Sequence, residues 1–415
     1  MKIRAFGLFF HTIEQSYPPC YNNIRKGAAL AAEEDMGESE NTKDRRSALW
    51  RLLHWAARNF LARKFDYTYE QIECEAPCLI VSNHVTNNDP FFVGLAHKSS
   101  PLSYVASEHI FRLGIISKIL IKLMDPIPRS KAASGAGTVK ACLRRIKNGE
   151  SIALFAEGDC TWDGRSAEVF PATGKLAKVC GAPLVTFRIE GGYLSSPRWA
   201  KKLRRGEMHG APVHVYTVEE LKGMTPEEVT ACINRDIYTD AREEQKKTPT
   251  VFRSEARAEG LERALFICPC CGEADCMKSK KHRLLCEKCG AEWEMDEYGA
   301  IKGPKFGSVA EWDEWQKNAV RDMKGGKLFA LEGTLTDIGA AAKQKTEVWL
   351  DADGGGIVFD GGRREPFSDI TDMAMVKTNR LLFEDGEGYF EIKSKRGILR
   401  PYLMAWRAAR GEKEA

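Results

Sequence analysis

The stretch that decides the fold is CLIVSNHVTNNDP, residues 78–90. Its apolar start has the composition of the end of a buried strand. A strand that ends at Asn83 puts His84 in a turn. Asp89 followed by Pro90 has the pattern of a helix start, with Asp89 as N-cap and Pro90 at the first helical position. We therefore predict a strand, a turn that carries His84, and a helix.

His84 and Asp89 are the first candidates for catalysis. The helix dipole favours an anionic carboxylate at a helix N-terminus, so Asp89 can accept from one imidazole nitrogen and leave the other free as a base. Acyl transfer uses this pairing of a base with an orienting group. The same spacing also fits an N-cap aspartate beside a turn histidine whose hydrogen bonds are satisfied. The pair alone does not decide between these readings.

Downstream residues alternate between helix and strand patterns. We predict helices at 134–147 and 173–179, and buried strands at 151–156 and 183–187. Another helix begins at Thr225, where the sequence TPEE has the pattern of a capping box with proline at the first position. This order predicts an α/β fold, a mainly parallel sheet flanked by helices.

Two further segments carry candidate ligand-binding residues. After the strand at 151–156, Gly158 permits a tight turn that leaves Glu157 and nearby N–H groups at the carboxyl edge of the sheet, where open α/β sheets bind ligands. Arg129 follows two prolines that hold the chain extended, so its guanidinium has a defined place. A guanidinium suits a phosphate, although Arg129 also fits a surface ion pair or a solvated charge.

The chain resembles the glycerophospholipid acyltransferase family, which includes the 1-acyl-sn-glycerol-3-phosphate acyltransferases. This resemblance implies that His84 is the catalytic base and Asp89 its partner. It also implies that Arg129, Glu157 and Gly158 bind the phosphate-bearing acceptor. The resemblance covers about residues 50–240 and consists of four blocks in the family's order, namely Asn83-His84 with Asp89, Ile127-Pro128-Arg129, Phe155-Ala156-Glu157-Gly158, and Pro183-Leu184-Val185.

The activity that the resemblance implies is transfer of a fatty acyl group from an acyl thioester to the free hydroxyl of 1-acyl-sn-glycerol-3-phosphate. The product is phosphatidic acid, in phospholipid biosynthesis. The donor is acyl-CoA or an acyl-carrier protein, and no catalytic cofactor or covalent acyl-enzyme is required. The alternative is a non-catalytic lipid-binding adaptor that recruits a partner. A lipid hydrolase is disfavoured, because the sequence has no G-x-S-x-G nucleophile turn.

The third block departs from the family pattern at two points. Ala156 stands where many members have proline, and Asp159 and Cys160 stand where they have threonine and arginine. Candidates to replace the arginine are Arg165, Arg188 and a basic run at 198–205. That run has five cations and one tryptophan in eight residues, and it fits either a solvated face or a site for anionic lipid.

A second signal is a pair of C-x2-C motifs separated by fourteen residues. This is the spacing of a zinc ribbon, with Cys268, Cys271, Cys286 and Cys289 as ligands. Four thiolates leave no open coordination position, so the predicted zinc is structural. A glycine after each motif allows a sharp turn. The alternative is a set of unliganded thiols. Cys270 and Cys276 are left over, and Cys270 can compete with a neighbour as a ligand.

Composition limits the setting of the protein. Lys and Arg number 62 against 58 Asp and Glu, and a net charge of +4 is too small to indicate nucleic-acid binding. Most of the thirteen cysteines stand singly, which indicates a reducing compartment. No apolar run reaches the roughly 18 residues of a spanning helix. We predict a cytoplasmic protein, peripheral on the inner face of the cell membrane, with a lysophospholipid, an acyl thioester and the membrane surface as partners, and an acyl-carrier protein as a further candidate.

The 415 residues exceed one ordinary domain. A basic amphipathic pattern at 49–65 fits either an interfacial helix or a helix packed on the domain. The last part, with several short strands and a helix at 399–409, resembles a pleckstrin-homology-like barrel in the order of its elements. The predicted parts are a mobile leader at 1–45, an acyltransferase domain at 46–255, a zinc ribbon at 256–300 and a β-rich domain at 301–415.

Overall fold

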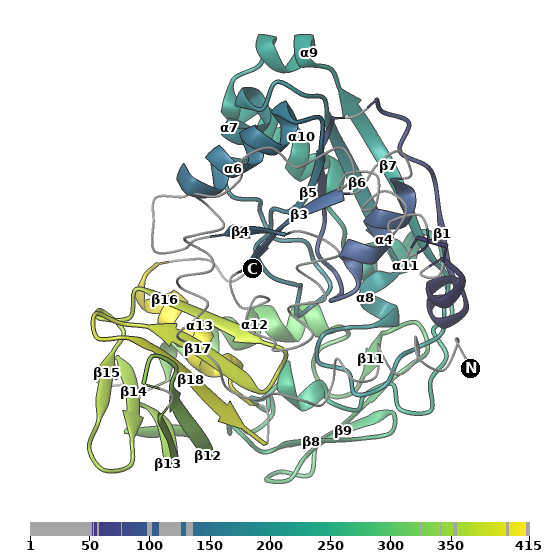
Figure 1. Ribbon diagram of the computed structural model, residues 1–415. Helices are drawn as coiled ribbons and strands as arrows, with labels where there is room; N and C mark the ends of the chain where they lie inside the picture. Colours follow the sequence, from purple (N-terminus) through teal and green to yellow (C-terminus); the bar gives the residue numbers. More distant parts are fainter. Residues whose placement is uncertain are drawn as a thin grey trace.

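The computed structural model describes residues 52, 54–55, 58–75, 77–97, 102–107, 126–129, 136–323, 326–340, 342–351, 355–395 and 398–411. The predicted leader at 1–45 lies outside the described residues. Within the described part, the chain forms three β-sheets of seven, four and seven strands. The first sheet lies in the upper half of Figure 1, and the other two lie below it.

The first sheet has the strand order β1-β7-β6-β2-β5-β3-β4. Its strands are β1 (Tyr67–Tyr69), β2 (Leu79–Ser82), β3 (Leu102–Ser107), β4 (Ile127–Arg129), β5 (Ser151–Phe155), β6 (Leu184–Glu190) and β7 (Met208–Tyr216). All neighbours are parallel except β6 and β7, which are antiparallel. The structure confirms the prediction of a mainly parallel sheet.

Helices cover both faces of this sheet. Leu79 and Val81 of β2 belong to an apolar cluster with α6 (Ala136–Lys147), α7 (Ala172–Val179) and α10 (Pro226–Ile237), whereas Ile80 belongs to the cluster of α4 (Asp89–Ala96). Successive side chains of a strand point to opposite faces, so the two helix layers are opposed. Full burial of a side chain such as Ile80 stabilises the fold by about 1.5–3 kcal/mol. The remaining helices of this part are α8 (Gly192–Ser195), α9 (Val218–Gly223) and α11 (Ala241–Lys247).

Two helix starts test the predictions from capping residues. Thr225 forms a complete capping box with Glu228 at the start of α10, which confirms that prediction. Asp89 is the first residue of α4 and not its N-cap, which is Asn88. The prediction is wrong by one residue, because the Asp89 carboxylate turns back toward the preceding turn.

The strand β7 was not predicted, and Pro212 explains why. A proline in the middle of a strand pattern argues against a strand, because it cannot donate to the ladder. Here the pairing of β6 with β7 shifts register between Thr186 and Phe187, next to Pro212, and this irregularity accommodates the missing donor.

The predicted amphipathic helix at 49–65 is helical over 58–65. Leu61 and Phe65 are buried in the core of the first domain. Leu52 and Trp55 are 61% and 66% exposed. The helix therefore packs on the domain at its end and presents apolar side chains to solvent nearer its start. Among the described residues, no helix has both the length and the apolar composition that a membrane crossing needs.

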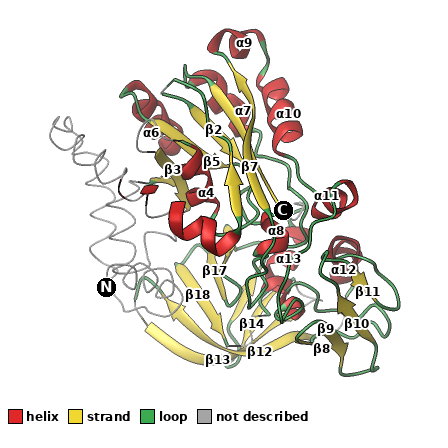
Figure 2. Cartoon of the chain, turned by 90° about the vertical axis from the view of Figure 1, so that its right-hand side faces the viewer, coloured by secondary structure: helices red, strands yellow, loops and turns green. Residues whose placement is uncertain are grey.

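The other two sheets are antiparallel, and Figure 2 shows both beneath the first sheet. The four-stranded sheet, which follows the 3-10 turn η2 (Leu261–Arg263), contains β8 (Met277–Lys280), β9 (Arg283–Cys286), β10 (Glu292–Met295) and β11 (Ile301–Lys302). The seven-stranded sheet contains β12 (Lys327–Asp337), β13 (Ala342–Asp351), β14 (Gly356–Phe359), β15 (Arg364–Pro366), β16 (Asp372–Val376), β17 (Arg380–Glu384) and β18 (Tyr389–Ser394). Helix α12 (Val309–Asp322) precedes that sheet and α13 (Arg400–Ala409) follows it.

One apolar cluster connects these parts. It runs from the four-stranded sheet through α12 and the seven-stranded sheet to α13, and it includes Trp162 and Trp199 of the first domain. The segments at 256–300 and 301–415 therefore share a core with each other and with part of the first domain. The predicted domain boundaries stay predictions.

Candidate active site

Asn83 anchors the turn that follows β2. Its Nδ2 donates to the carbonyl oxygen of Ile189 at 2.9 Å, and its Oδ1 accepts the N–H of Ile189 at 2.8 Å. The side-chain amide thus continues the pairing of β2 with β6 at the carboxyl edge of the sheet. The sequence pattern did not reveal this anchor, because nothing near Asn83 marks a partner so far along the chain.

The Asp89 carboxylate holds the turn between β2 and α4 by accepting hydrogen bonds from it. Its Oδ2 lies 2.8 Å from Nδ1 of His84, and it accepts the N–H groups of Val85 and Thr86 at 2.7 and 2.9 Å. Its Oδ1 accepts the Thr86 hydroxyl at 2.8 Å. An aspartate carboxylate accepts hydrogen bonds and does not donate them, so Nδ1 of His84 carries a proton, and in the neutral imidazole Nε2 is the nitrogen with the lone pair.

The surroundings of His84 make it a stronger base than a free histidine. Burial lowers the pKa of His84, whereas the Cys160 sulfur and the Asp89 carboxylate raise it, and the net direction is well above the usual value. Burial raises the pKa of the Cys160 thiol. Asp89, whose side chain is fully buried beside the ring, stabilises the imidazolium. The His84 side chain is still 20% exposed, so a substrate can reach it.

Two side chains pack on the imidazole ring of His84. The Phe155 ring stacks on it, with centroids 4.6 Å apart and an interplanar angle of 27°. The Cys160 sulfur lies 3.4 Å from Nδ1 and 3.3 Å from Nε2. The sulfur is shared between the two nitrogens and does not replace Asp89, at 2.8 Å, as the partner of Nδ1. Cys160 is therefore a packing contact, and the sequence marked it only as a departure from the family pattern.

Glu157 and Gly158 form the tight turn after β5, as predicted. Gly158 has a φ of 86°. The Glu157 carboxylate is 3% exposed and accepts the N–H groups of His84 at 2.8 Å and Ala167 at 2.9 Å. Burial raises the pKa of Glu157 to about 7, and these two N–H groups act in the opposite direction. Glu157 therefore supports the backbone of His84, and its contact with an acceptor stays a prediction.

Arg129 reaches the same place from β4. Its guanidinium lies 4.4 Å from the centroid of the Phe170 ring. One of its nitrogens lies 3.6 Å from the point where a Cβ of Gly158 would stand. Burial lowers the pKa of Arg129, and Asp372 of β16 raises it. The structure thus brings the five predicted site residues together at the carboxyl ends of β2, β4 and β5. The sequence did not reveal that Asp372 of the C-terminal sheet acts on Arg129.

Of the candidates to replace the family's arginine, Arg198 of the basic run reaches the loop after β5. Its Nη1 lies 2.6 Å from Oδ2 of Asp159, and its side chain is 5% exposed. Arg165 lies further along the same loop and pairs with Asp163 and with Glu314 of α12, whereas Arg188 pairs with Glu190 on β6. Arg204 is also buried, at 2% exposed. The run is therefore not one solvated face, because two of its five cations point into the protein.

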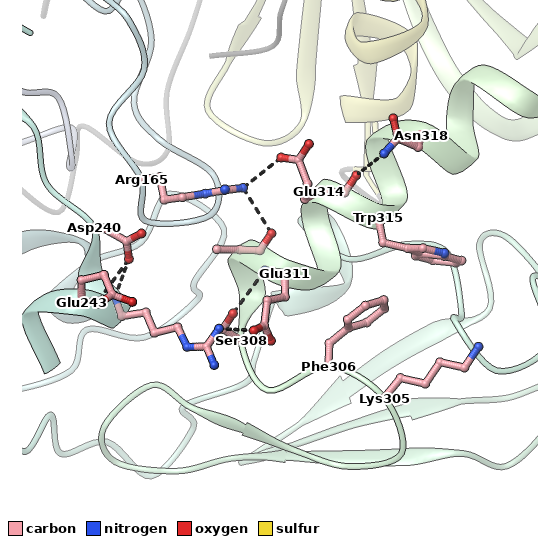
Figure 3. Close-up of a pocket in the computed structure, with 12 residues that line it drawn as sticks. Arg165, Asp240, Glu243, Lys305, Phe306, Ser308, Glu311, Glu314, Trp315 and Asn318 are labelled. Carbon is pink, nitrogen blue, oxygen red and sulfur yellow. Dashed lines mark hydrogen bonds and ion pairs between the residues drawn. The ribbon is translucent and has the colours of Figure 1, made fainter. Parts of the chain in front are cut away.

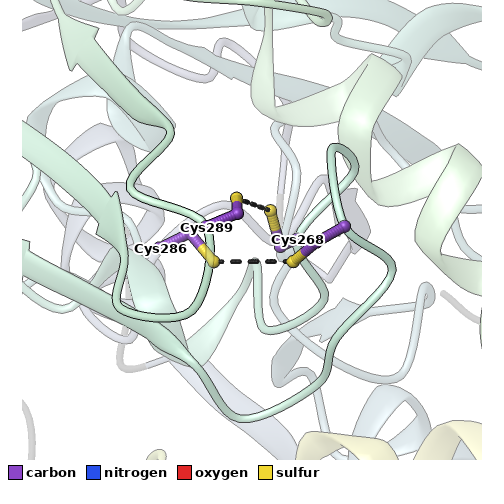
Figure 4. A group of neighbouring side chains, drawn as sticks. Cys268, Cys286 and Cys289 are labelled. Carbon is purple, nitrogen blue, oxygen red and sulfur yellow. Dashed lines mark hydrogen bonds between the residues drawn. The ribbon is translucent and has the colours of Figure 1, made fainter.

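The four predicted zinc ligands form a cluster (Figure 4). The sulfur atoms of Cys268, Cys271, Cys286 and Cys289 lie within 4.8 Å of one another. Cys268 and Cys289 are 3.7 Å apart, as are Cys271 and Cys286. Zn–S bonds of about 2.3 Å in a tetrahedron separate the sulfurs by about 3.8 Å. The donor set and its spacing therefore fit a zinc ion.

The spare thiol beside this cluster is Cys276 and not Cys270. The Cys276 sulfur lies 3.4 Å from that of Cys286 and donates to the carbonyl oxygen of Glu273 at 3.2 Å. Cys270 is exposed and outside the cluster. Competition by Cys270 as a ligand is therefore wrong for this structure, because the flanking Cys268 and Cys271 supply the two thiols of this turn.

A separate hollow of about 670 Å3 lies between α11 and α12 (Figure 3). Phe306 and Trp315 form an aromatic wall, with centroids 5.7 Å apart. Its charged rim is internally paired, since Arg165 meets Glu314 at 3.1 Å and Arg242 bonds to Glu311. None of the five predicted site residues lines it, so it is not the predicted acceptor site.

Comparisons with known proteins place the first domain in context. Residues 64–190 match the Acyltransferase family model. A chloroplastic 1-acyl-sn-glycerol-3-phosphate acyltransferase from Brassica napus is 25% identical over 118 residues, which are 28% of this chain and 34% of that protein. A probable 1-acyl-sn-glycerol-3-phosphate acyltransferase from Mycoplasma genitalium is 28% identical over 131 residues, which are 29% of this chain and 47% of that protein. The chain thus spans less than half the length of these two relatives.

A solved structure is also similar. The crystal structure of the 1-acyl-sn-glycerophosphate acyltransferase from Thermotoga maritima has a TM-score of 0.39 and 17% identity, over 59% of this chain and 97% of that one. A TM-score of this size is too low to carry an argument about fold or function.

Proposed function

Since residues 64–190 match the Acyltransferase family model, we propose that this chain moves a fatty acyl group from an acyl thioester to the free hydroxyl of 1-acyl-sn-glycerol-3-phosphate. The product is phosphatidic acid. The observation that carries the proposal is the 2.8 Å hydrogen bond between Nδ1 of His84 and Asp89, which leaves Nε2 free as a base. Both curated relatives are named for this acceptor, which supports the choice of substrate.

The mechanism follows from the tautomer of His84. Nε2 takes the proton of the acceptor hydroxyl while that oxygen attacks the thioester carbonyl carbon. Collapse of the tetrahedral intermediate breaks the carbon–sulfur bond, and the imidazolium returns its proton to the leaving thiolate. Asp89 keeps the ring oriented and stabilises the imidazolium between these steps. The chain supplies both groups itself, so we propose no catalytic cofactor.

Arg129 is the residue that we propose for the acceptor phosphate. Its guanidinium is a planar fork that suits phosphate oxygens, and its place over Phe170 beside Gly158 supports this role. Glu157 and Gly158 shape the loop on the other side of the same site. The acyl donor is acyl-CoA or an acyl-carrier protein.

We further propose that the protein works at the inner face of the cell membrane, where its acceptor resides. The exposed Leu52 and Trp55 support this proposal, because they lie on a helix that also exposes Arg58 and Arg63. An amphipathic helix of this kind binds an anionic lipid surface with its apolar side chains in the interface. We also propose that β12–β18 and α13 form a pleckstrin-homology-like domain.

Incubation of the full chain with acyl-CoA and a panel of lysophospholipids tests the substrate. Identification of the products by mass should show phosphatidic acid from 1-acyl-sn-glycerol-3-phosphate. A different acylated product would correct the headgroup. The absence of any acylated product from purified, folded protein would contradict the activity and favour the adaptor.

We also propose that the cysteine cluster holds a structural zinc ion. The tetrahedral spacing of its sulfurs supports this. Metal analysis of protein purified without chelators should find about one zinc per chain, and Cys286→Ser should lose it. Cys270→Ser is the matched control, because Cys270 is exposed and outside the cluster. A chain free of zinc in both forms would refute this proposal.

A further inference from the structure

The loop after β5 holds the backbone of His84 at two points. Glu157 Oε1 accepts the N–H of His84 at 2.8 Å. The carbonyl oxygen of His84 accepts the N–H of Thr161 at 3.0 Å. Neither contact involves the imidazole, so the loop sets the position from which the ring projects. The geometry of His84 therefore depends on what holds residues 157–162.

Arg198 holds this loop through three contacts. Its Nη1 forms the 2.6 Å ion pair with Asp159, and the same nitrogen donates to the carbonyl oxygen of Cys160 at 3.0 Å. Its guanidinium carbon lies 4.2 Å from the centroid of the Trp162 ring. A guanidinium can form all three contacts at once, because its donors lie in a rigid plane whose face stacks on aromatic rings. One largely buried side chain thus contacts Asp159, Cys160 and Trp162 of this loop.

The C-terminal sheet completes this arrangement. Arg198 Nη2 donates to the carbonyl oxygen of Lys377 at 3.3 Å, in the turn between β16 and β17. Arg400 of α13 also lies over the Trp162 ring, at 4.8 Å, and it is anchored by a buried ion pair with Asp313 of α12 at 2.6 Å. Trp162 belongs to the same apolar cluster as the C-terminal sheet. The loop that supports His84 is therefore packed against the last third of the chain.

We propose that Arg198 is a positioning residue for acyl transfer and that it makes the C-terminal sheet part of the working active site. The proposal rests on the proposed function, because it gives Arg198 a role in that reaction. Arg198 contacts neither the imidazole nor a reacting atom. It acts by fixing the loop at 157–162, and through that loop it fixes the backbone of His84.

Removal of Arg198 would leave the half-buried Asp159 carboxylate, which is 24% exposed, without its ion-pair partner. The titratable groups that act on His84 are Asp89 from α4 and Glu157, Asp159 and Cys160 from the loop. Burial raises the pKa of Asp159, but Arg198 lowers it, and the net direction is downward. Arg407 of α13 also lowers the pKa of Asp159 and would remain. Without Arg198, an ionised Asp159 would be less compensated and would raise the pKa of His84 further.

Three variants of the full chain test the role of Arg198 in kcat, KM and pH profile. Arg198→Gln should lower kcat by about 10- to 100-fold, as expected for a misplaced catalytic group, with a smaller change in KM. The acid limb of its kcat/KM profile should move to higher pH. Arg198→Lys should recover part of kcat, because it keeps the charge but not the planar fork. The double variant Arg198→Gln with Asp159→Asn should return the limb toward its wild-type position while kcat stays low.

Arg145→Gln is the matched control for loss of an ion pair. Arg145 pairs with Glu150 at 3.0 Å, and the two side chains are 15% and 18% exposed. This pair lies where α6 ends and β5 begins, at the opposite edge of the sheet from His84. Arg145→Gln should lower the melting temperature without moving the pH profile.

NMR titration of the His84 ring in wild type and Arg198→Gln separates this proposal from the proposed function. Failure of the wild type to acylate any lysophospholipid would refute the function, whereas the His84 titration would still decide the role of Arg198. A folded Arg198→Gln variant with kcat within about twofold of wild type and an unchanged His84 pKa would overturn the proposal. If Arg198→Gln does not fold, Asp159→Asn alone should lower the pKa of His84, and no change there would overturn it.

Discussion

The turn at 83–89 and the loop at 157–162 meet at His84, yet they are held in different ways. Asp89 holds the turn through contacts with His84, Val85 and Thr86, all within five residues. The loop is held by Arg198, which also reaches the C-terminal sheet. The difference shows that the residues proposed for the chemistry are positioned by neighbours in the sequence, whereas the loop that supports them is positioned by distant parts of the chain. Changes in the turn should abolish activity, and changes in the loop should reduce it.

The largest effect is expected for Asp89→Ala. Loss of the orienting carboxylate should lower kcat by about 10²- to 10⁴-fold, the contribution typical of general base catalysis. The buried N–H groups of Val85 and Thr86 would lose their acceptor, at about 1–3 kcal/mol each. Initial rates and thermal unfolding measure the two effects.

A buried aspartate away from the site provides the control for Asp89. Asp236 is 4% exposed and accepts from Tyr216 at 2.7 Å and Thr186 at 3.0 Å. Asp236→Ala should lower stability and leave kcat close to wild type. Equal kcat values for Asp89→Ala and Asp236→Ala would show that Asp89 supports the fold only and has no specific role in catalysis.

A smaller effect is expected for Glu157→Gln in the loop. The glutamine amide keeps one oxygen that can accept a backbone N–H, but its NH2 group would face the other of the two N–H donors. The loop should therefore shift, and kcat should fall by about 10-fold through misplacement of His84. Stability provides a second readout. The pKa of Glu157 is raised to about 7 in the folded protein, from an ordinary value of about 4.3. The stability that its protonated form contributes is therefore fully present below about pH 4.3 and is lost as pH rises through the folded pKa.

The melting temperatures of wild type and Glu157→Gln, compared across pH, test that sign. The melting temperature of the wild type minus that of the variant should decrease as pH rises from about 4.3 to 7. Only the wild type has a carboxyl group at position 157 that loses its proton in this range. Burial also raises the pKa of Glu244 to about 7, but Glu244 is common to both proteins, so its titration cancels in the difference. A difference that grows with pH would show that the ionised carboxylate is the stabilising form.

Gly158→Ala should act mainly on stability. The φ of 86° strains any residue with a side chain, and an added Cβ would stand 2.6 Å from the Phe170 ring. Together these should destabilise the fold by about 1–3 kcal/mol, with a several-fold loss of activity. The double variant with Phe170→Ala should relieve the steric part and leave the backbone strain. Full recovery in the double variant would show that the φ at this position has no cost.

The smallest effect is expected for Cys160→Ala. Cys160 packs over the imidazole as a small apolar group, so its loss should change kcat by less than about threefold. Intact-protein mass after incubation with acyl-CoA should show no acyl adduct. An adduct that disappears in Cys160→Ala would make Cys160 a nucleophile and replace direct transfer with a covalent route.

Sequence patterns predicted the local features of this molecule. The spacing of His84 and Asp89 predicted their contact, and two C-x2-C motifs predicted a cluster of four thiols. Periodicity and capping residues located the buried strands β2, β5 and β6 and the helix α10. In each case the residues that interact lie close together or follow a fixed spacing, so the chain itself carries the geometry.

The features that the sequence did not reveal depend on long-range contacts. Asn83 pairs with Ile189, and Arg198 reaches Asp159 and Lys377, and no local pattern marks these partners. A basic run predicts solvated charge, yet burial of Arg198 requires knowledge of the surfaces that cover it. The sequence therefore indicates the reaction more readily than the support that positions it.

The most direct test of the central claim is the rate of acyl transfer by His84→Ala. The claim is that Nε2 of His84 is the base and that the surrounding fold does not depend on the ring. Thermal unfolding should show a folded variant, and product formation from acyl-CoA and 1-acyl-sn-glycerol-3-phosphate should fall by about 10²- to 10⁴-fold. A folded His84→Ala variant that retains wild-type turnover would contradict the account.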